Sequence, residues 1–267
     1  MRIDLYLFEN GYAESRQKAK AYIEKGSVSV DGRSVSKPSE VIDESIPHTV
    51  TVSNTEKYVG RGGYKLGHAL EAFKIDVTGK SCVDIGASTG GFTDCLLQNG
   101  ARHVCAVDSG KGQLHPRIAS DSRVSSFEGL NARYMTLQDI AREPFDVAVM
   151  DVSFISQTLL IPVIAGLIKE GAVLVSLIKP QFEAGRGALN KNGIVKKDTD
   201  RYLAVTGVVT CALSHGFTLD GLCTSPITGG DGNVEYLCVF TLREDDASPQ
   251  STQDVDNIIR KTVFNKA

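Results

Sequence analysis

Short apolar runs alternate with longer segments of helical period from residue 81 to about residue 243. Such runs, bounded by glycine or charged residues, are typical of buried strands, and an apolar residue at every third or fourth position is typical of helices. The alternation predicts an α/β fold with a mainly parallel sheet covered on both faces. The last two strands, joined by a glycine-rich loop, should pair antiparallel at one edge. The expected strands are the run with Cys82, Val83 and Ile85, then 103–108, 145–151, 172–178, 218–224 and 236–242, and the expected helices are 159–168 and 202–215.

Residues 1–55 follow a different pattern, which predicts a small α+β module of two helices and a hairpin. Positive charge gathers on the second helix. The expected elements are a helix with Ile3, Leu7 and Phe8 on one face, a helix capped by Ser15 with Ala19, Tyr22 and Ile23 on its apolar face, a hairpin from Val28 and Val30 through Asp31-Gly32 to Val35, and a strand over 49–52.

Two further segments complete the expected organisation. Residues 56–64 carry three glycines around Arg61, which predicts a flexible, basic linker. A helix with Leu66, Ala69, Leu70 and Phe73 on its apolar face then opens a domain over 65–243. Residues 244–267 combine a polar linker with a short amphipathic helix, which could dock on this domain or on a partner chain.

Composition places the chain among ordinary globular proteins, with 42% hydrophobic and 23% charged residues. The longest apolar stretch, 159–168, is far shorter than the roughly 20 residues of a membrane span. No targeting leader opens the sequence, so we expect a cytoplasmic protein without a membrane partner. The six cysteines have no metal-ligand spacing, and we expect no metal. A net charge of −3 implies that any polyanion is met by local basic patches.

The turn after the first of these strands carries the ligand chemistry. It contains Asp-x-Gly-x-x-x-Gly-Gly rather than the Gly-x-Gly-x-x-Gly of dinucleotide sites, and Asp84 would repel a pyrophosphate. S-adenosylmethionine has no phosphate but carries an ammonium and a sulfonium, which a carboxylate attracts directly or through water. Asp108 ends the next strand, 24 residues later, where an acid binds ribose hydroxyls in such folds. The expected cofactor residues are Asp84, Gly86, Ser88, Gly90, Gly91, Phe92 and Asp108.

The alternative for this stretch is a glycine turn with two helix-capping acids. Downstream, two motifs are missing that would point to other methylation chemistry. The Asn/Asp-Pro-Pro-aromatic run of amino-group methyltransferases and a Pro-Cys nucleophile for pyrimidine carbon are both absent. The charged residues that remain at strand or helix ends are Lys65, Asp151, Lys179 and Glu235.

Two resemblances bring these features together. Ser15-Arg-x-x-Ala followed by Gly26-x-Val-x-Val-Asp-Gly resembles the S4 RNA-binding domain. The order Lys65, Asp151, Lys179, Glu235 resembles the tetrad of FtsJ-like ribose 2'-O-methyltransferases. Together with Gly-Gly-Tyr-Lys65, Asp151-Val-Ser-Phe-Ile-Ser, Lys179-Pro-Gln-Phe-Glu and Gly-Asn-Val-Glu235, they resemble the hemolysin-A-like (TlyA) family, whose characterised members methylate ribosomal RNA.

The resemblance implies a Rossmann-like domain that uses S-adenosylmethionine to methylate a ribose 2'-hydroxyl of ribosomal RNA, alone or within a ribosomal subunit, and no DNA partner. A protonated hydroxyl needs a base as it attacks the methyl group. We expect Lys179 as this base or as the oxyanion partner, Lys65 as an electrostatic helper, and Asp151 and Glu235 as carboxylates that orient the lysines. Taken singly, each could equally belong to a surface ion pair. The expected RNA contacts are Arg16, Lys18, Lys20, Arg33, Arg61 and Arg186.

Two other functions remain as alternatives. A non-catalytic RNA-binding or ribosome-assembly factor could retain the methyltransferase fold, although the acid and the lysine at strand ends argue against it. The family name implies hemolysis, which the lack of an adequate apolar span disfavours.

Overall fold

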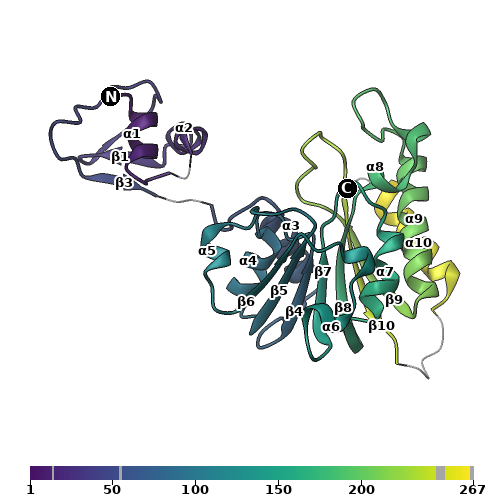
Figure 1. The fold of residues 1–267 in the computed structure, drawn as a ribbon. Helices are drawn as coiled ribbons and strands as arrows, with labels where there is room; N and C mark the ends of the chain where they lie inside the picture. Colours follow the sequence, from purple (N-terminus) through teal and green to yellow (C-terminus); the bar gives the residue numbers. More distant parts are fainter. Residues whose placement is uncertain (14, 54–55, 245–249, 265–267) are drawn as a thin grey trace. The chain divides into compact units, whose positions relative to one another are not determined.

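A computed structural model describes residues 1–13, 15–53, 56–244 and 250–264 (Figure 1). Backbone contacts divide the chain into two compact units, Met1–Lys57 and Tyr58–Ala267. We call them the N-terminal unit and the C-terminal unit and describe each by itself.

The N-terminal unit packs two helices against a three-stranded sheet of order β2-β1-β3. Ser15 caps the second helix, because its hydroxyl accepts the Lys18 N–H at 3.1 Å. The hairpin turns at Asp31 and Gly32, both with positive φ. Two helices and a hairpin are thus confirmed, whereas Phe8 is 45% exposed because it lies off the face that buries Ile3 and Leu7. The elements are α1 (Ile3–Glu9), α2 (Arg16–Glu24), β1 (Val28–Val30), β2 (Arg33–Ser34) and β3 (Val50–Val52).

The C-terminal unit is built on a seven-stranded sheet of order β6-β5-β4-β7-β8-β10-β9 (Figure 1). Five strands run parallel, and β10 lies antiparallel between β8 and β9. The mainly parallel sheet with an antiparallel edge is therefore confirmed. The order reverses between β4 and β7, and ligands of open α/β sheets bind at the carboxyl ends of strands at such a point. The strands are β4 (Ser81–Ile85), β5 (His103–Asp108), β6 (Val124–Glu128), β7 (Phe145–Met150), β8 (Ile168–Ile178), β9 (Phe217–Thr224) and β10 (Tyr236–Leu242).

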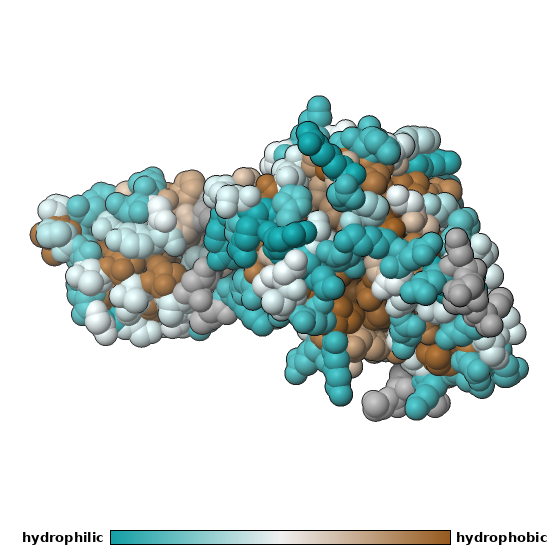
Figure 2. All heavy atoms as spheres, turned by 90° about the horizontal axis from the view of Figure 1, so that it is seen from below, coloured by the Kyte–Doolittle hydropathy of each residue, from teal (hydrophilic) through white to brown (hydrophobic). Residues whose placement is uncertain are grey.

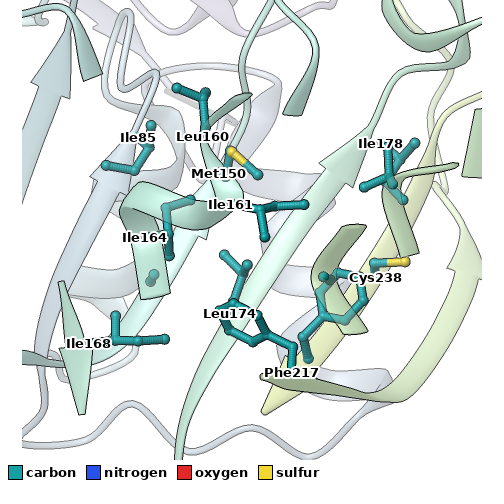
Figure 3. Close-up of a cluster of buried hydrophobic side chains, with 14 of the residues drawn as sticks. Ile85, Met150, Leu160, Ile161, Ile164, Ile168, Leu174, Ile178, Phe217 and Cys238 are labelled. Atoms are coloured by element: carbon teal, nitrogen blue, oxygen red, sulfur yellow. The ribbon is translucent and has the colours of Figure 1, made fainter. Parts of the chain in front are cut away.

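Helices cover both faces of this sheet. Successive strand residues point to opposite faces, so Cys82 packs with one group of helices while Val83 and Ile85 pack with the other. Leu66 of α3 and Leu96 of α4 lie on the Cys82 side. The opposite side is the larger core, where Ile161 and Ile164 of α7 lie with Met150 of β7 and Leu174 of β8 (Figure 3). Helices α9 and α10 add further apolar residues to this core. The helices are α3 (Gly62–Ala72), α4 (Gly91–Gln98), α5 (Pro116–Ala119), α6 (Leu137–Ile140), α7 (Ile161–Ala165), α8 (Pro180–Glu183), α9 (Asp198–Ser214) and α10 (Thr252–Phe264), with single 3-10 turns η1 (Ala132–Tyr134), η2 (Gln157–Leu159) and η3 (Arg186–Ala188).

The structure differs from the predicted elements at two places in this unit. The expected helix over 159–168 is shorter, because Gly166 ends α7. Strand β8 already begins at Ile168, four residues before the predicted strand, and it bends at Gly171, which has φ +73°. Strand β6 was not predicted, because its sequence Val-Ser-Ser-Phe-Glu has few apolar residues. It forms the edge of the sheet and is nowhere fully buried.

The junction also differs from the expected linker over 56–64. Tyr58 is only 3% exposed, and a side chain at Gly63 would come within 2.3 Å of its ring. The Val59 N–H donates to Asp94 at 2.8 Å, and α3 begins at Gly62. The glycines therefore allow this segment to pack closely on α4 and do not act as a flexible linker. Residues 58–64 belong to the C-terminal unit.

The tail ends in α10, which docks on the C-terminal unit by burying Val255, Ile259 and Val263. Part of the predicted tail, 245–249 and 265–267, lies outside the described residues.

Other sequence expectations concern cysteines, metals and membranes. All six cysteines are free. Within the described residues, no cluster of histidine, cysteine and acidic side chains could hold a metal ion, and no helix has the length and apolar character to cross a bilayer. Hydrophilic residues cover much of the face seen in Figure 2, with smaller apolar areas between them.

Replacement by alanine should have opposite effects on stability at two glycines of the C-terminal unit. Gly221 lies in β9 against Phe73, whose ring atoms would come within 2.3 Å of an added Cβ, whereas Gly207 in α9 has no atom within 4 Å of that position. We expect Gly221→Ala to lower the free energy of unfolding by about 2 kcal/mol through overpacking. Gly207→Ala should raise it by about 0.5–1 kcal/mol, because alanine favours helix. Urea unfolding of both variants measures this, and equal effects would contradict it.

Candidate active site

The loop from β4 to α4 brings bare backbone to the carboxyl edge of the sheet. Gly86 and Gly90 have φ of +85° and +91°, and Ser88 is left-handed as well at +48°. A Cβ at Gly86 would come within 2.5 Å of the Asp151 carbonyl oxygen. Glycine is thus required both by the turn and by the close approach of the segment after β7.

A cavity of about 650 Å³ opens beside this loop, within the usual size range of cofactor sites. Asp108 is fixed at its wall, since its two carboxylate oxygens accept the N–H groups of Ser88 at 2.8 Å and Gly110 at 2.7 Å. We name this space the carboxyl-edge cavity. Its lining includes Ile85, Gly86, Ser88, Val107, Asp108, Gly110, Leu130, Asn131, Ala132, Asp151, Val152, Ser153, Phe154 and Ile155.

Three of the seven expected cofactor residues, Gly86, Ser88 and Asp108, line the carboxyl-edge cavity. Phe92 instead packs in the core between α3 and α4 and is 3% exposed. The others that lie outside the lining are Asp84, Gly90 and Gly91.

Asp84 is completely buried beneath the loop. Its Oδ2 accepts the Thr93 hydroxyl at 2.6 Å, and its Oδ1 has no hydrogen-bond partner among the described residues. Burial raises the pKa of Asp84 to about 7, and the negative charges of Asp151 and Asp108 add to the effect. Asp84 therefore lies behind the wall of the cavity rather than in its lining.

Two lysine–carboxylate pairs lie at the same edge. Lys65 Nζ is 2.5 Å from the Glu235 carboxylate, and both residues are buried. Lys179 Nζ is 2.6 Å from Asp151 and donates to Ser153 Oγ at 2.9 Å. A buried charge is stable only when paired, which fixes the position of Lys65. Lys179 and Asp151 are partly exposed, and the contact with Ser153 helps to hold Lys179.

The sheet brings the two pairs together from distant parts of the sequence. In the antiparallel ladder of β8 and β10, Tyr236 pairs with Ile178, so the adjoining Glu235 and Lys179 face each other at the end of the ladder. Asp151 follows β7, the neighbour of β8, and a Cβ at Gly62, one turn before Lys65, would lie 3.6 Å from its Oδ2. All four expected catalytic residues thus meet at one edge of the sheet.

Sequence reasoning missed several residues of this region. Phe154 is 92% exposed with φ +64°, an uncommon conformation for a bulky residue, and it lies at the cavity beside Ser153. An exposed aromatic ring can stack on a nucleic-acid base. Asn131 and Ala132 line the cavity after β6, and they were missed with that strand. The signal for Phe154 was its place in Asp151-Val-Ser-Phe.

The six expected RNA-binding residues divide into two groups. Three of them form ion pairs with acids of the N-terminal unit: Arg16 with Asp4 at 3.0 Å, Lys18 with Glu56 at 3.1 Å, and Arg33 with Glu40. The other three are exposed, Lys20 on α2, and Arg61 and Arg186 in the C-terminal unit. A phosphate that binds Arg16, Lys18 or Arg33 would have to compete with the acid already paired with that residue.

Comparisons with known proteins give a consistent picture. Residues 58–242 match the model of the FtsJ-like methyltransferases, and residues 1–45 match the S4 domain. The 16S/23S rRNA (cytidine-2'-O)-methyltransferase TlyA of Mycobacterium tuberculosis is 40% identical over 98% of this chain and 97% of its own length. Hemolysin A of Brachyspira hyodysenteriae is 42% identical over 91% of this chain and all of its own. A solved structure from Streptococcus thermophilus, 38% identical, superposes with a TM-score of 0.73 over 98% of this chain and 94% of that one.

The buried Asp84 predicts an unusual dependence of stability on pH. Its pKa is higher in the folded chain than its ordinary 3.8, so the stability that it contributes is present at low pH and is lost as the pH rises through about 7. Part of that stability is already lost at pH 5, so we expect the gain in the free energy of unfolding from Asp84→Asn to be about 2–3 kcal/mol larger at pH 8 than at pH 5. Urea unfolding without added ligand measures both.

Asp146→Asn is the matched control for this prediction. Burial opposes ionisation of Asp146, but hydrogen bonds from Lys169 and the Ser81 N–H outweigh it and lower its pKa. Its contribution to stability is therefore present at high pH, and its loss should destabilise the protein at pH 8. A loss of stability in Asp84→Asn that is the same at both pH values would contradict our reading of Asp84.

Proposed function

The chain belongs to the FtsJ-like methyltransferase family, and on that premise we propose that it transfers a methyl group from S-adenosylmethionine to a ribose 2'-hydroxyl of ribosomal RNA. The relative from Mycobacterium tuberculosis named above carries this activity in its name. The observation that supports the proposal most directly is the meeting of two lysine–carboxylate pairs beside the carboxyl-edge cavity. We place the activity in the cytoplasm, on ribosomal RNA or ribosomal subunits.

The carboxyl-edge cavity fits S-adenosylmethionine. Asp108 is oriented by two backbone N–H groups and retains lone pairs for the ribose hydroxyls of the cofactor. Gly86 lines the cavity without a side chain, and a cationic ligand beside the buried Asp84 would favour the ionised form of that carboxyl. When bound, the cofactor supplies an electrophilic methyl group on its sulfonium.

The residues around the acceptor hydroxyl have to remove a proton and stabilise the developing oxygen charge. Lys179 is the residue for both tasks, because its Nζ contacts Asp151 and Ser153 of the cavity wall. As the neutral amine it would take the hydroxyl proton, and as the resulting ammonium it would stabilise the charge on the oxygen. Lys65 adds positive charge from the neighbouring pair, and Asp151 and Glu235 hold the two amines in place. The residue roles proposed from the sequence are thus compatible with the geometry of the site.

RNA would be bound by both units. The S4 domain supplies Arg16, Lys18, Lys20 and Arg33 for phosphate contacts, which give affinity and position rather than base identity. On the C-terminal unit, Arg61 and Arg186 provide exposed positive charge, and Phe154 provides an exposed ring for an unstacked base near the methyl group.

Methyl-labelled cofactor with ribosomal RNA, free or in subunits, tests the proposed function. We expect label on one or a few nucleotides, each resistant to alkaline cleavage on its 3' side, because a methylated 2'-oxygen cannot attack the adjacent phosphate. Label on a base would contradict the ribose assignment. Binding without any label would favour the alternative of an RNA-binding or assembly factor.

Lys179→Ala should abolish methyl transfer, with a fall in kcat of at least about 100-fold, because it removes the group that handles the proton. Affinity for RNA and for cofactor should change by less than about threefold, since most of those contacts are elsewhere. Lys169→Ala is the matched control, because Lys169 lies at the other end of β8 in an exposed pair with Asp146 at 2.5 Å. Full turnover in Lys179→Ala would refute the assignment.

A further inference from the structure

Two segments that carry the reacting groups run side by side at the carboxyl edge. One is the loop 151–157 after β7, which we call the β7 loop, and the other is the segment 179–183, formed by Lys179 and α8. They touch at both ends and in the middle. The first contact is the pair of Lys179 with Asp151, supported by Ser153.

The middle contact is aromatic. The rings of Phe154 and Phe182 lie 5.1 Å apart between centroids with a tilt of 54°. A ring pair of this geometry contributes about 0.5–1.5 kcal/mol beyond its buried area. Phe154 remains 92% exposed beside the cavity despite this contact.

The third contact belongs to Glu183, at the far end of both segments. Its Oε1 accepts the Gln157 N–H at 2.9 Å, and its Oε2 accepts the Ser156 hydroxyl at 2.5 Å. Ser156 and Gln157 open the 3-10 turn η2, where backbone N–H groups lack helical partners, so the carboxylate satisfies a free donor. Glu183 therefore closes the β7 loop against α8.

The end of the β7 loop is also fixed to β8. Gln157 is 1% exposed, its Nε2 donates to the Leu177 carbonyl oxygen at 2.6 Å, and its Oε1 accepts the Ser176 hydroxyl at 2.6 Å. Burial raises the pKa of Glu183, and the hydrogen bonds from Gln157 and Ser156 partly offset this cost of an ionised carboxylate.

We propose that Glu183 is a positioning residue for methyl transfer, which fixes the β7 loop so that Asp151 and Ser153 hold Lys179 in line with the acceptor oxygen. The inference rests on the proposed function. Its physical basis is that misplacement of a reacting group by about 1 Å costs up to 100-fold in rate. Glu183 is not among the residues that line the cavity, so its loss should disturb alignment more than binding.

Glu183→Gln tests the proposal, because it keeps size and shape but presents an N–H₂ group where two donors need acceptors. We expect kcat to fall about tenfold or more, with KM for RNA and for S-adenosylmethionine within about threefold of the wild type. Ser156→Ala removes half of the same contact, so the double variant should lose much less than the product of the two single effects. The matched control is Glu170→Gln, an exposed glutamate near the start of β8, which should leave kcat unchanged.

Amide hydrogen exchange gives a readout that does not depend on activity. Glu183→Gln should raise exchange in peptides of the β7 loop, and Glu170→Gln should not. An unchanged kcat in folded Glu183→Gln, or unchanged exchange in the β7 loop, would overturn the proposal. A fall in kcat that only follows a loss of folded protein, measured by thermal unfolding, would overturn it as well. If the wild type labels no ribose, the proposed function fails, while hydrogen exchange still decides whether Glu183 holds the loop.

Discussion

The high cost of placing a charged group away from water governs the arrangement of this site. An unpaired ammonium or carboxylate at a buried position costs several kcal/mol, whereas a paired and hydrogen-bonded one is tolerated. Lys65 and Glu235 are both nearly inaccessible, at 8% and 2% exposure, and each is stable only because the other is present. The fold must therefore bring Lys65 and Glu235 together, so the pair forms only when the sheet is correctly assembled.

The antiparallel direction of β10 brings these charged partners to the same edge of the sheet. If β10 ran parallel to β8, its C-terminal end would lie at the carboxyl edge, and Glu235 would lie at the other edge of the sheet. Because β10 enters the sheet in the reverse direction, the residues before it, including Glu235, lie beside Lys179 at the end of β8. The glycine-rich loop that precedes β10 thus lies at the carboxyl edge. The proposed pairing of Lys65 with Glu235 beside Lys179 requires this reversed strand.

Much of this fold could be predicted from apolar periodicity, since strands such as 236–242 and the amphipathic stripe of α2 depend on local sequence. Strand β6 could not, because two serines and a glutamate on an edge strand give no apolar signal. The four charged residues of the edge were identified by their order, but their pairing depends on long-range register. Glu183 was missed as a functional candidate because its partners, Ser156 and Gln157, are close only in space.

Gly86 has a consequence for how this enzyme family can vary. The missing side chain lets the loop after β4 approach the Asp151 carbonyl oxygen, so the ends of β4 and β7 meet through their backbones. A larger residue would push the two strands apart and would lengthen the path of the methyl group. The spacing of β4 and β7 at the carboxyl edge, where Asp151 pairs with Lys179, is therefore set by main-chain atoms in contact.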